Sequence, residues 1–428
     1  AYINTNEVQL NINVEDSNLI DEEIVQDTSS KEKKNIISIK RNDEEILEKG
    51  LTPKDNKIDI SKALSEEGKY NIYARIVDKA GHEEVVEFEF TIDRTAPVIT
   101  MPDFDKLNNS FNNSDKTVVI NVEERNFENN KVNVELTKVT PDGVKTTENL
   151  DYPNTGVVTS NSYNNFADEG EYTITVSAVD MTGNEAVEVH KVLKMTTDKT
   201  APQVSITGTE DGEHYNTDKE VTLLSNDVNH NVNTVTVTRD GSNYSIGDLR
   251  IDGRDAALTH IFSEEGEYSI TLYSKDEAGN ENKTTKTFTI DKTAPVITPM
   301  IEEENREIKD GEYINKIFTP EFRLDKDGDK FDSITLNNND VTGEVPIAAS
   351  EMTYTYSLQA SDKAGNVTKK NITFTVDITN PKVKVNGILD GVFNKDVKPE
   401  YEITDANLDN ENTKVTLNDN PFESGTKI

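Results

Sequence analysis

The chain has 428 residues, no cysteine and a formal net charge of −36, from 45 basic and 81 acidic residues. A charge of this sign and size argues against nucleic acid and anionic membrane surfaces as partners, because both would repel it. The absence of cysteine excludes disulfides and a thiol nucleophile. No apolar run is long enough to cross a bilayer, so we expect no membrane insertion.

One segment recurs four times along the chain. Each copy contains a strand with alternating apolar residues, such as YNIYARIVD in the first copy and YTITVSAVD in the second. Each strand ends in a D-x-x-G turn, whose aspartates are Asp78, Asp180, Asp276 and Asp362. A repeat of roughly 90–100 residues is too long for a solenoid and suits small domains placed in a row.

A second repeated feature is a short aromatic segment that precedes another strand. It contains Phe111-Asn112, Tyr215-Asn216, Tyr313-Ile314-Asn315 and Phe393-Asn394, and Tyr2-Ile3-Asn4 has the same form. The two repeats predict domains at 1–93, 94–198, 199–291 and 292–377, with a partial fifth domain at 378–428. The first domain is expected to lack its opening strand, as in a piece of a longer protein.

The predicted joints between domains are short. They read Asp93-Arg94-Thr95-Ala96-Pro97, Asp198-Lys199-Thr200-Ala201-Pro202, Asp291-Lys292-Thr293-Ala294-Pro295 and Asp377-Ile378-Thr379-Asn380-Pro381. Proline fixes φ and favours an extended residue before it, so each joint is expected to be a stiff hinge in an elongated, monomeric rod. Only the stretch from Asp21 could hold a short helical turn; every domain otherwise reads as an all-β sandwich.

Three motifs in a fixed order resemble the tandem bacterial immunoglobulin-like repeats of Gram-positive surface proteins and adhesins. They are the Thr-Ala-Pro joint, the Gly-x-Tyr before the alternating strand and the D-x-x-G-N turn. The resemblance covers essentially the whole chain and implies immunoglobulin-like β-sandwich domains. It places strand A after the joint, strand F at the alternating segment and strand G after the turn. The fourth domain departs from the pattern, since Met352-Thr353-Tyr354 replaces Gly-x-Tyr.

Glycine and tyrosine in this pattern have an architectural explanation. Gly68, Gly170 and Gly266 stand where a corner needs an unusual backbone angle, and a tyrosine follows two residues later. This spacing resembles a tyrosine corner, in which the ring packs inside and the hydroxyl bonds the backbone. The tyrosines are Tyr70, Tyr172 and Tyr268.

The immunoglobulin-like topology places the end of one strand G against the B–C and F–G loops of the next domain. Carboxylates should therefore meet at each joint. The predicted sets are Asp93 with Glu123, Glu124 and Asp180; Asp198 with Asp227 and Asp276; and Asp291 with Asp325, Asp327 and Asp362. The fourth joint keeps Asp377 and Asp405 but lacks the turn.

Carboxylates that meet in this way repel one another unless they are protonated, solvated or neutralised. Ca²⁺ binds six to eight oxygens in tolerant geometry, so one hypothesis is that Ca²⁺ stiffens the joints. The alternative is that each aspartate caps its own turn in water. No complete EF-hand loop exists, and the Asp325-Lys326-Asp327-Gly328-Asp329 stretch also fits a solvated turn.

The second domain contains an aromatic-rich insertion that starts at Leu150. Its aromatic residues could form an adaptable ligand-binding loop or cover the flank of the sandwich; they are Tyr152, Tyr163 and Phe166.

Catalysis finds little support in the sequence. The five histidines are scattered and form no metal-binding or nucleophile motif. We therefore expect no enzyme but a structural stalk of a secreted or cell-surface protein. Two alternatives remain: an adhesin-type module that binds a host extracellular protein or glycan, and the accessory region of a large secreted hydrolase.

Overall fold

The computed structural model describes residues 1–20, 35–125, 131–153, 157–187, 192–388 and 390–428. The helical turn predicted from Asp21 lies outside these residues. The chain separates into two compact units. One comprises Ala1–Pro202 together with Asp227–Val232 and Lys275–Asn282, and the other comprises Gln203–Asn226, Asn233–Ser274 and Lys283–Ile428. Two loops of the third predicted domain thus group with the second joint.

The first sandwich has one sheet in the order β1-β7-β6-β3-β4 and a second sheet of β2 and β5. Its strands are β1 (Tyr2–Ile3), β2 (Val8–Glu15), β3 (Ile36–Arg41), β4 (Glu44–Gly50), β5 (Lys57–Leu64), β6 (Gly68–Val77) and β7 (Glu83–Ile92).

The second sandwich pairs the sheet β13-β10-β8 with the sheet β12-β11-β14-β15-β9. A single helical turn, α1 (Phe104–Leu107), precedes β9. The strands are β8 (Val98–Thr100), β9 (Ser110–Asn112), β10 (Val118–Glu123), β11 (Lys131–Val139), β12 (Lys145–Leu150), β13 (Val158–Tyr163), β14 (Gly170–Val179) and β15 (Val192–Thr197).

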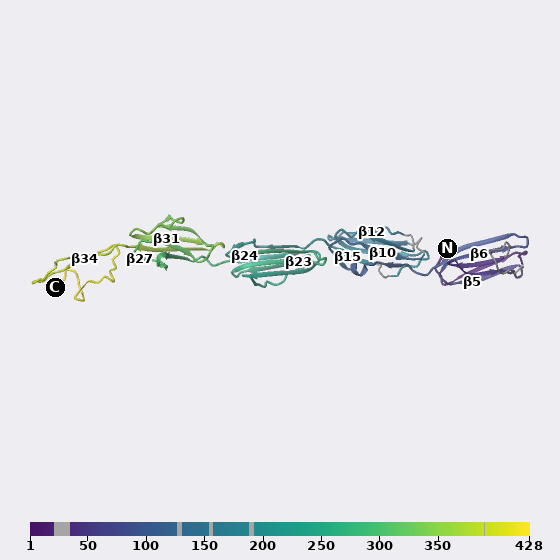
Figure 1. Cartoon of the computed structure of the whole chain (residues 1–428), viewed down its shortest axis with the longest axis horizontal. Coiled ribbons are helices and arrows are strands. Elements are labelled where there is room, and N and C mark those ends of the chain that lie inside the picture. The colour runs from purple at the N-terminus through teal and green to yellow at the C-terminus, as the bar shows by residue number, and fades with distance from the viewer. Residues whose placement is uncertain (21–34, 126–130, 154–156, 188–191, 389) are drawn as a thin grey trace. The chain divides into compact units, whose positions relative to one another are not determined.

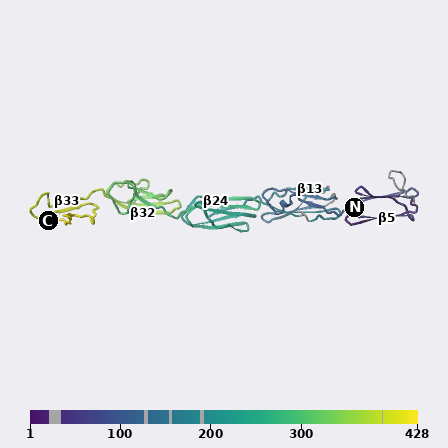
Figure 2. The same ribbon diagram turned by 60° about the horizontal axis from the view of Figure 1, so that its bottom comes forward.

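The third sandwich has the sheets β16-β18-β22-β21 and β17-β24-β23-β19-β20. Figures 1 and 2 show its strands running side by side. They are β16 (Gln203–Thr207), β17 (Glu213–Tyr215), β18 (Lys219–Asn226), β19 (His230–Arg239), β20 (Ser242–Asn243), β21 (Arg250–Asp252), β22 (Asp255–Phe262), β23 (Gly266–Asp276) and β24 (Glu281–Ile290).

The fourth sandwich has the sheets β26-β25-β28 and β27-β32-β31-β29-β30. Its elements are β25 (Ile297–Ile301), the 3₁₀ turn η2 (Glu302–Glu304), β26 (Arg306–Glu307), β27 (Glu312–Ile314), β28 (Pro320–Leu324), β29 (Lys330–Leu336), β30 (Asn339–Asp340), β31 (Met352–Ser361) and β32 (Val367–Val376).

The described residues of 378–428 form two small hairpins instead of a sandwich. β33 (Lys382–Asn386) pairs with β34 (Glu400–Thr404), and β35 (Thr416–Leu417) pairs with β36 (Asn420–Pro421). Val383 and Val385 on β33 remain 63% and 54% exposed, because no described strand covers them.

The repeated aromatic segment has the same structural place in all four sandwiches. It forms a short strand that runs parallel to the end of the last long strand, as β17 does beside β24. The same parallel pairing joins β1 to β7, β9 to β15 and β27 to β32. The segment at Tyr2 therefore occupies the place that its sequence predicts.

Each of the four sandwiches has its own apolar core between the two sheets. In the third, Val221 and Leu223 from β18 pack in one cluster with Tyr268 and Ile270 from β23, and all four are fully buried. Alternation along each strand supplies this face, since every second side chain points inward. The observed class is therefore an all-β chain of tandem sandwiches.

The tyrosine corner is confirmed. The hydroxyl of Tyr268 donates to the carbonyl of Glu264 at 2.8 Å, four residues upstream, and Tyr172 bonds Asp168 in the same way at 2.7 Å. Tyr70 and Tyr354 repeat the contact. Gly170 has φ of 148°, and a Cβ there would lie 2.7 Å from the carbonyl oxygen of Val139, which explains the glycine.

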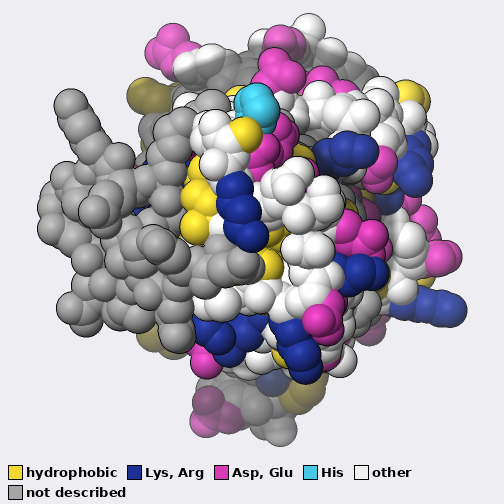
Figure 3. Space-filling model, turned by 90° about the vertical axis from the view of Figure 1, so that its right-hand side faces the viewer, with side chains coloured by type: hydrophobic (Ala, Val, Ile, Leu, Met, Phe, Trp, Pro, Cys, Tyr) yellow, Lys and Arg dark blue, Asp and Glu magenta, His cyan; other side chains and the backbone are white. Residues whose placement is uncertain are grey.

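On the face drawn in Figure 3, basic and acidic side chains are interspersed, and apolar side chains are visible between them. Among the described residues, none of the helices has the length and apolar character that crossing a bilayer requires.

Candidate cation centres at the joints

Each joint begins with an aspartate whose backbone amide still donates a hydrogen bond to the preceding sandwich. The amide of Asp198 donates to the carbonyl of Asn112, and its Oδ1 accepts from the amide of Thr200 at 3.2 Å. The same two contacts recur at Asp93, Asp291 and Asp377. The local Asx turn that the sequence suggests is therefore present at every joint.

A glutamate from the tyrosine corner fastens the next residues. At the third joint, Glu265 accepts hydrogen bonds from the amide of Lys292 at 2.7 Å and from the hydroxyl of Thr293 at 2.8 Å. The equivalent glutamates at the other joints are Glu67, Glu169 and Glu351. Each joint is thus held by hydrogen bonds as well as by its proline.

The D-x-x-G-N turn of the following sandwich closes on this joint. Within the turn, Asp276 accepts the amide of Asn280 at 2.8 Å and its side-chain Nδ2 at 2.7 Å. The same Nδ2 donates to the backbone carbonyl of Asp198 at 2.8 Å, which lies in the joint.

This asparagine contact recurs at three joints. Asn184 reaches the carbonyl of Asp93 at 3.2 Å, and Asn366 reaches that of Asp291 at 2.7 Å. In the first sandwich His82 stands in the asparagine position and bonds Asp78 instead.

At the first joint, Asp93, Glu124 and Asp180 each offer an oxygen, and these oxygens lie within 4.8 Å of one another. All three side chains are buried, with 4%, 3% and 6% of their surface exposed. Glu123, by contrast, is exposed at the end of β10. The structure therefore brings together the predicted set, apart from Glu123.

The second joint gathers Asp198, Asp227 and Asp276 within the same 4.8 Å limit. Asp276 is fully buried, and each of the other two is 7% exposed. Burial, together with the nearby Asp276 charge, raises the pKa of Asp198, although hydrogen bonds from Asn229 and Thr200 oppose the shift. Burial and the charges of Asp198 and Asp276 likewise raise the pKa of Asp227, against the hydrogen bond from Asn229.

The chemistry of these two clusters suits a hard cation. Two carboxylates about 5 Å apart repel by roughly 3–4 kcal/mol at an effective dielectric constant near 20, more than the ~1 kcal/mol that a typical hydrogen bond contributes. Carboxylate and carbonyl oxygens are the ligands of Ca²⁺, which tolerates irregular geometry. In the first joint Asp93, Glu124 and Asp180 would hold the ion, and in the second Asp198, Asp227 and Asp276.

The third joint does not assemble the predicted set. Asp325 and Asp327 are exposed, Asp291 and Asp362 are half-buried, and no cluster of this kind forms there among the described residues. Asp325 instead accepts the amide of Val296 at 2.6 Å. The ammonium of Lys326 lies 3.3 Å from Oδ2 of Asp291, so a cationic side chain occupies this joint.

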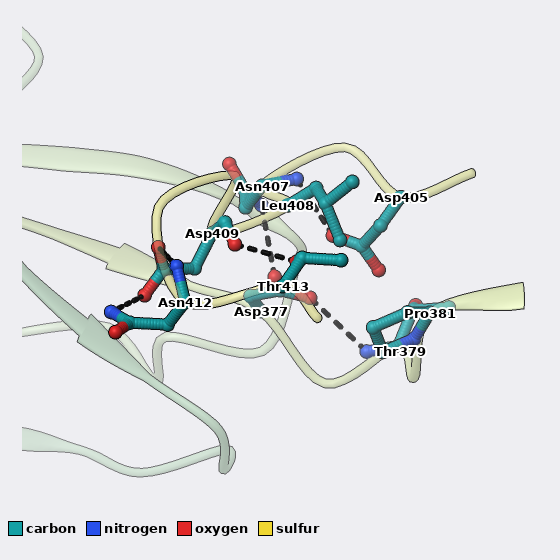
Figure 4. A pocket seen from close by; sticks show the side chains of 9 residues that line it. All are labelled: Asp377, Thr379, Pro381, Asp405, Asn407, Leu408, Asp409, Asn412 and Thr413. Carbon is teal, nitrogen blue, oxygen red and sulfur yellow. Dashed lines mark hydrogen bonds between the residues drawn. The ribbon is translucent and has the colours of Figure 1, made fainter. Parts of the chain in front are cut away.

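The fourth joint is open. A hollow of about 340 Å³ is lined by Asp377, Thr379, Pro381, Asp405, Asn407, Leu408, Asp409, Asn412 and Thr413 (Figure 4). Asn407 donates to Asp377 at 3.1 Å, as Asn229 does to Asp198 at 2.6 Å in the second joint. The described part of the chain supplies no turn like that of Asp276 here.

The aromatic residues of the second sandwich lie in its core. Tyr152, Tyr163 and Phe166 are 9%, 6% and 0% exposed. The hydroxyl of Tyr152 donates to the carbonyl of Thr159 at 2.9 Å, and that of Tyr163 to Asp151 at 2.8 Å. These rings offer no open aromatic face, which favours their covering role over a ligand-binding loop.

The cross-joint asparagines and the glutamates of the tyrosine corner were missed from the sequence. Both repeat in register, the asparagine in every D-x-x-G-N turn and the glutamate just before the Gly-x-Tyr motif. That repetition is the signal that could have identified them, because a turn alone needs only the aspartate and the glycine.

Comparison with protein families agrees with this fold. Residues 262–353 match the family model of the bacterial Ig-like domain (group 3), which confirms the resemblance to bacterial immunoglobulin-like repeats. The match begins in the third predicted domain and ends in the fourth.

Solved structures similar to the chain include a tetra-tandem repeat from the extending region of a large adhesion protein. That structure is 15% identical, covers 81% of this chain and 92% of its own, and has a TM-score of 0.40. The I67–I69 fragment of titin is 13% identical over 68% of this chain and 94% of its own, with a TM-score of 0.33. The fibronectin(III)-like modules of Clostridium thermocellum CbhA are 13% identical over 41% and 94%, with a TM-score of 0.22. No curated protein matches the chain in sequence.

Proposed function

We propose that the chain is a non-catalytic spacer of a bacterial secreted or cell-surface protein, in which hydrogen-bonded joints keep successive sandwiches aligned. The observation that supports this most directly is the repeated joint: the same aspartate, glutamate and asparagine contacts occur at three successive places. A flexible linker would need none of them. In a spacer of this kind, each added domain increases the distance at which a functional head is displayed.

We further propose that Ca²⁺ stiffens the first and second joints. Each of these joints buries three carboxylates at short mutual distances, and these acids come from the joint itself and from the loops of the next sandwich. A bound cation would convert their repulsion into attraction and tie the loops to the joint.

Small-angle X-ray scattering of the full chain tests the spacer, with measurements in millimolar CaCl₂ and in EGTA. A rod is expected to add about 35 Å of maximum dimension per domain. Ca²⁺ should narrow the range of maximum dimensions that the chain adopts in solution. A maximum dimension typical of a collapsed or freely jointed chain in both conditions would contradict the spacer. If the scattering profiles are identical in both conditions and show an extended chain, the spacer proposal stands and the stiffening role of Ca²⁺ is contradicted.

The sequence supported the adhesin alternative through an aromatic-rich segment that could form a ligand-binding loop. The structure does not favour that role, because Tyr152, Tyr163 and Phe166 are buried. A screen of the full chain against host extracellular proteins and glycans addresses it separately.

A further inference from the structure

The third joint differs from the second in the side chain that contacts its first aspartate. Lys326 directly follows Asp325 in the loop after β28, and its ammonium lies 3.3 Å from Oδ2 of Asp291. In the second joint the corresponding oxygen, Oδ2 of Asp198, accepts a neutral amide from Asn229 at 2.6 Å. The residue that follows Asp227 there is Val228, which is 48% exposed.

The turn that closes the third joint is built like that of the second. Asn366 donates to the carbonyl of Asp291 at 2.7 Å and to Oδ2 of Asp362 at 2.7 Å, as Asn280 does with Asp198 and Asp276. The asparagine contacts are thus shared, while the loop of the third joint carries Lys326, Asp327 and Asp329 where that of the second carries Val228 and Asn229.

We propose that Lys326 takes the place of the cation in the third joint, so that this joint is closed by a built-in ammonium and does not depend on Ca²⁺. The inference rests on the proposed Ca²⁺ sites of the first two joints. Lys326 lies among the carboxylates of Asp291, Asp325 and Asp329, all of which interact electrostatically with it. An ammonium held there supplies the positive charge and hydrogen-bond donors that an ion would otherwise provide.

The proposal makes the joints of one chain unequal. Removing Ca²⁺ should loosen the first and second joints and leave the third closed. The chain would then retain one aligned pair of sandwiches under conditions in which the other pairs move independently.

Calorimetric titration of the full chain with CaCl₂, supported by Tb³⁺ luminescence, counts the sites. The native chain should bind two ions. Lys326→Asn exposes the carboxylates of the third joint to one another and should raise the number to three, whereas Lys326→Arg should keep it at two. Val228→Lys places an ammonium beside the second cluster and should lower the number to one. Lys369→Asn, an exposed lysine on β32, is the matched control and should leave two sites.

The outcomes separate the two proposals. A native chain that binds no ion overturns the Ca²⁺ sites and, with them, the role of Lys326. If the native chain and Lys326→Asn both bind two ions, and circular dichroism shows that the variant is folded, the role of Lys326 alone is overturned. Hydrogen exchange of residues 291–295 gives an independent readout: EGTA should leave it unchanged in the native chain and increase it in Lys326→Asn.

Discussion

The side-chain amide of Asn280 donates a hydrogen bond to the backbone carbonyl of Asp198 at 2.8 Å and so fastens the turn of one sandwich to the joint before it. The same Nδ2 also donates to Asp276 at 2.7 Å. One side chain therefore shapes its turn and holds the joint, which explains why the turn repeats as D-x-x-G-N and not as D-x-x-G alone.

Asn280→Ala should loosen the second joint without unfolding the third sandwich. The substitution removes two side-chain hydrogen bonds, each contributing about 1 kcal/mol. Hydrogen exchange of residues 198–202 should accelerate several-fold, while that of β23 stays slow. Asn226→Ala is the control, because the side-chain amide of Asn226 donates to the exposed Asp255 in the same sandwich. Equal exchange at the joint in both variants would refute the fastening role.

Gly170→Ala should destabilise the second sandwich by about 1–3 kcal/mol. Gly170 combines a φ of 148° with a Cβ position 2.7 Å from the carbonyl oxygen of Val139. Gly143 also has a positive φ, of 87°, but nothing lies within 4 Å of its Cβ position. Thermal unfolding followed by circular dichroism should therefore show a larger loss for Gly170→Ala than for Gly143→Ala; an equal loss would mean that backbone strain alone matters.

Protonation of Glu265 should weaken the third joint. Hydrogen bonds from the hydroxyl of Thr293 and the amide of Lys292 lower the pKa of Glu265. A carboxyl with a depressed folded-state pKa stabilises the fold above its unfolded pKa of about 4.3, and that stability disappears as the pH falls through the folded value. Glu265→Gln should therefore lower the melting temperature at pH 6 and have progressively less effect below pH 4.

The exposed Glu220, replaced by Gln, is the control for that experiment. A difference between native chain and Glu265→Gln that is the same at pH 6 and at pH 3 would show that the charge of Glu265 is irrelevant to the joint.

His260 should titrate below the usual histidine range. Burial lowers the pKa of its imidazole, whose ring packs 4.7 Å from that of Phe262. Because the neutral form is favoured in the fold, stability should fall as the pH drops from about 6.5 through the folded pKa. NMR titration of the ring protons measures this, with His260→Gln assigning the resonance. A midpoint at or above 6.5 would contradict the prediction.

The sequence was sufficient for those parts of the fold that depend on one residue type at one place. Tyr268 and Gly266 predict a corner because glycine favours the φ of 148° found at Gly266, and a tyrosine both packs and bonds there. The first two joint clusters followed from topology, since the order of strands decides which loops meet. The third did not, because whether Asp291 meets Asp325 or Lys326 depends on side-chain directions within one loop.

Burial was the other quantity that the sequence could not provide. Tyr152, Tyr163 and Phe166 lie among asparagines and serines, a composition shared by binding loops and by core-covering segments. The hydroxyl contacts of the two tyrosines, to the carbonyls of Thr159 and Asp151, show that both side chains belong to the core.

Asp227→Asn should have opposite effects with and without Ca²⁺. In EGTA the native carboxylate is buried beside Asp198 and Asp276, so its neutral replacement removes repulsion and should raise the melting temperature of the third sandwich by a few degrees. An asparagine keeps an oxygen that can accept the amide of Asn229, as Oδ1 of Asp227 does at 2.6 Å. In CaCl₂ the same change removes a charged ligand and should lower the melting temperature relative to the native chain. Asp255→Asn, an exposed aspartate on β22, should shift neither value appreciably. A variant that is more stable than the native chain in both conditions would mean that the second cluster repels without ever binding an ion.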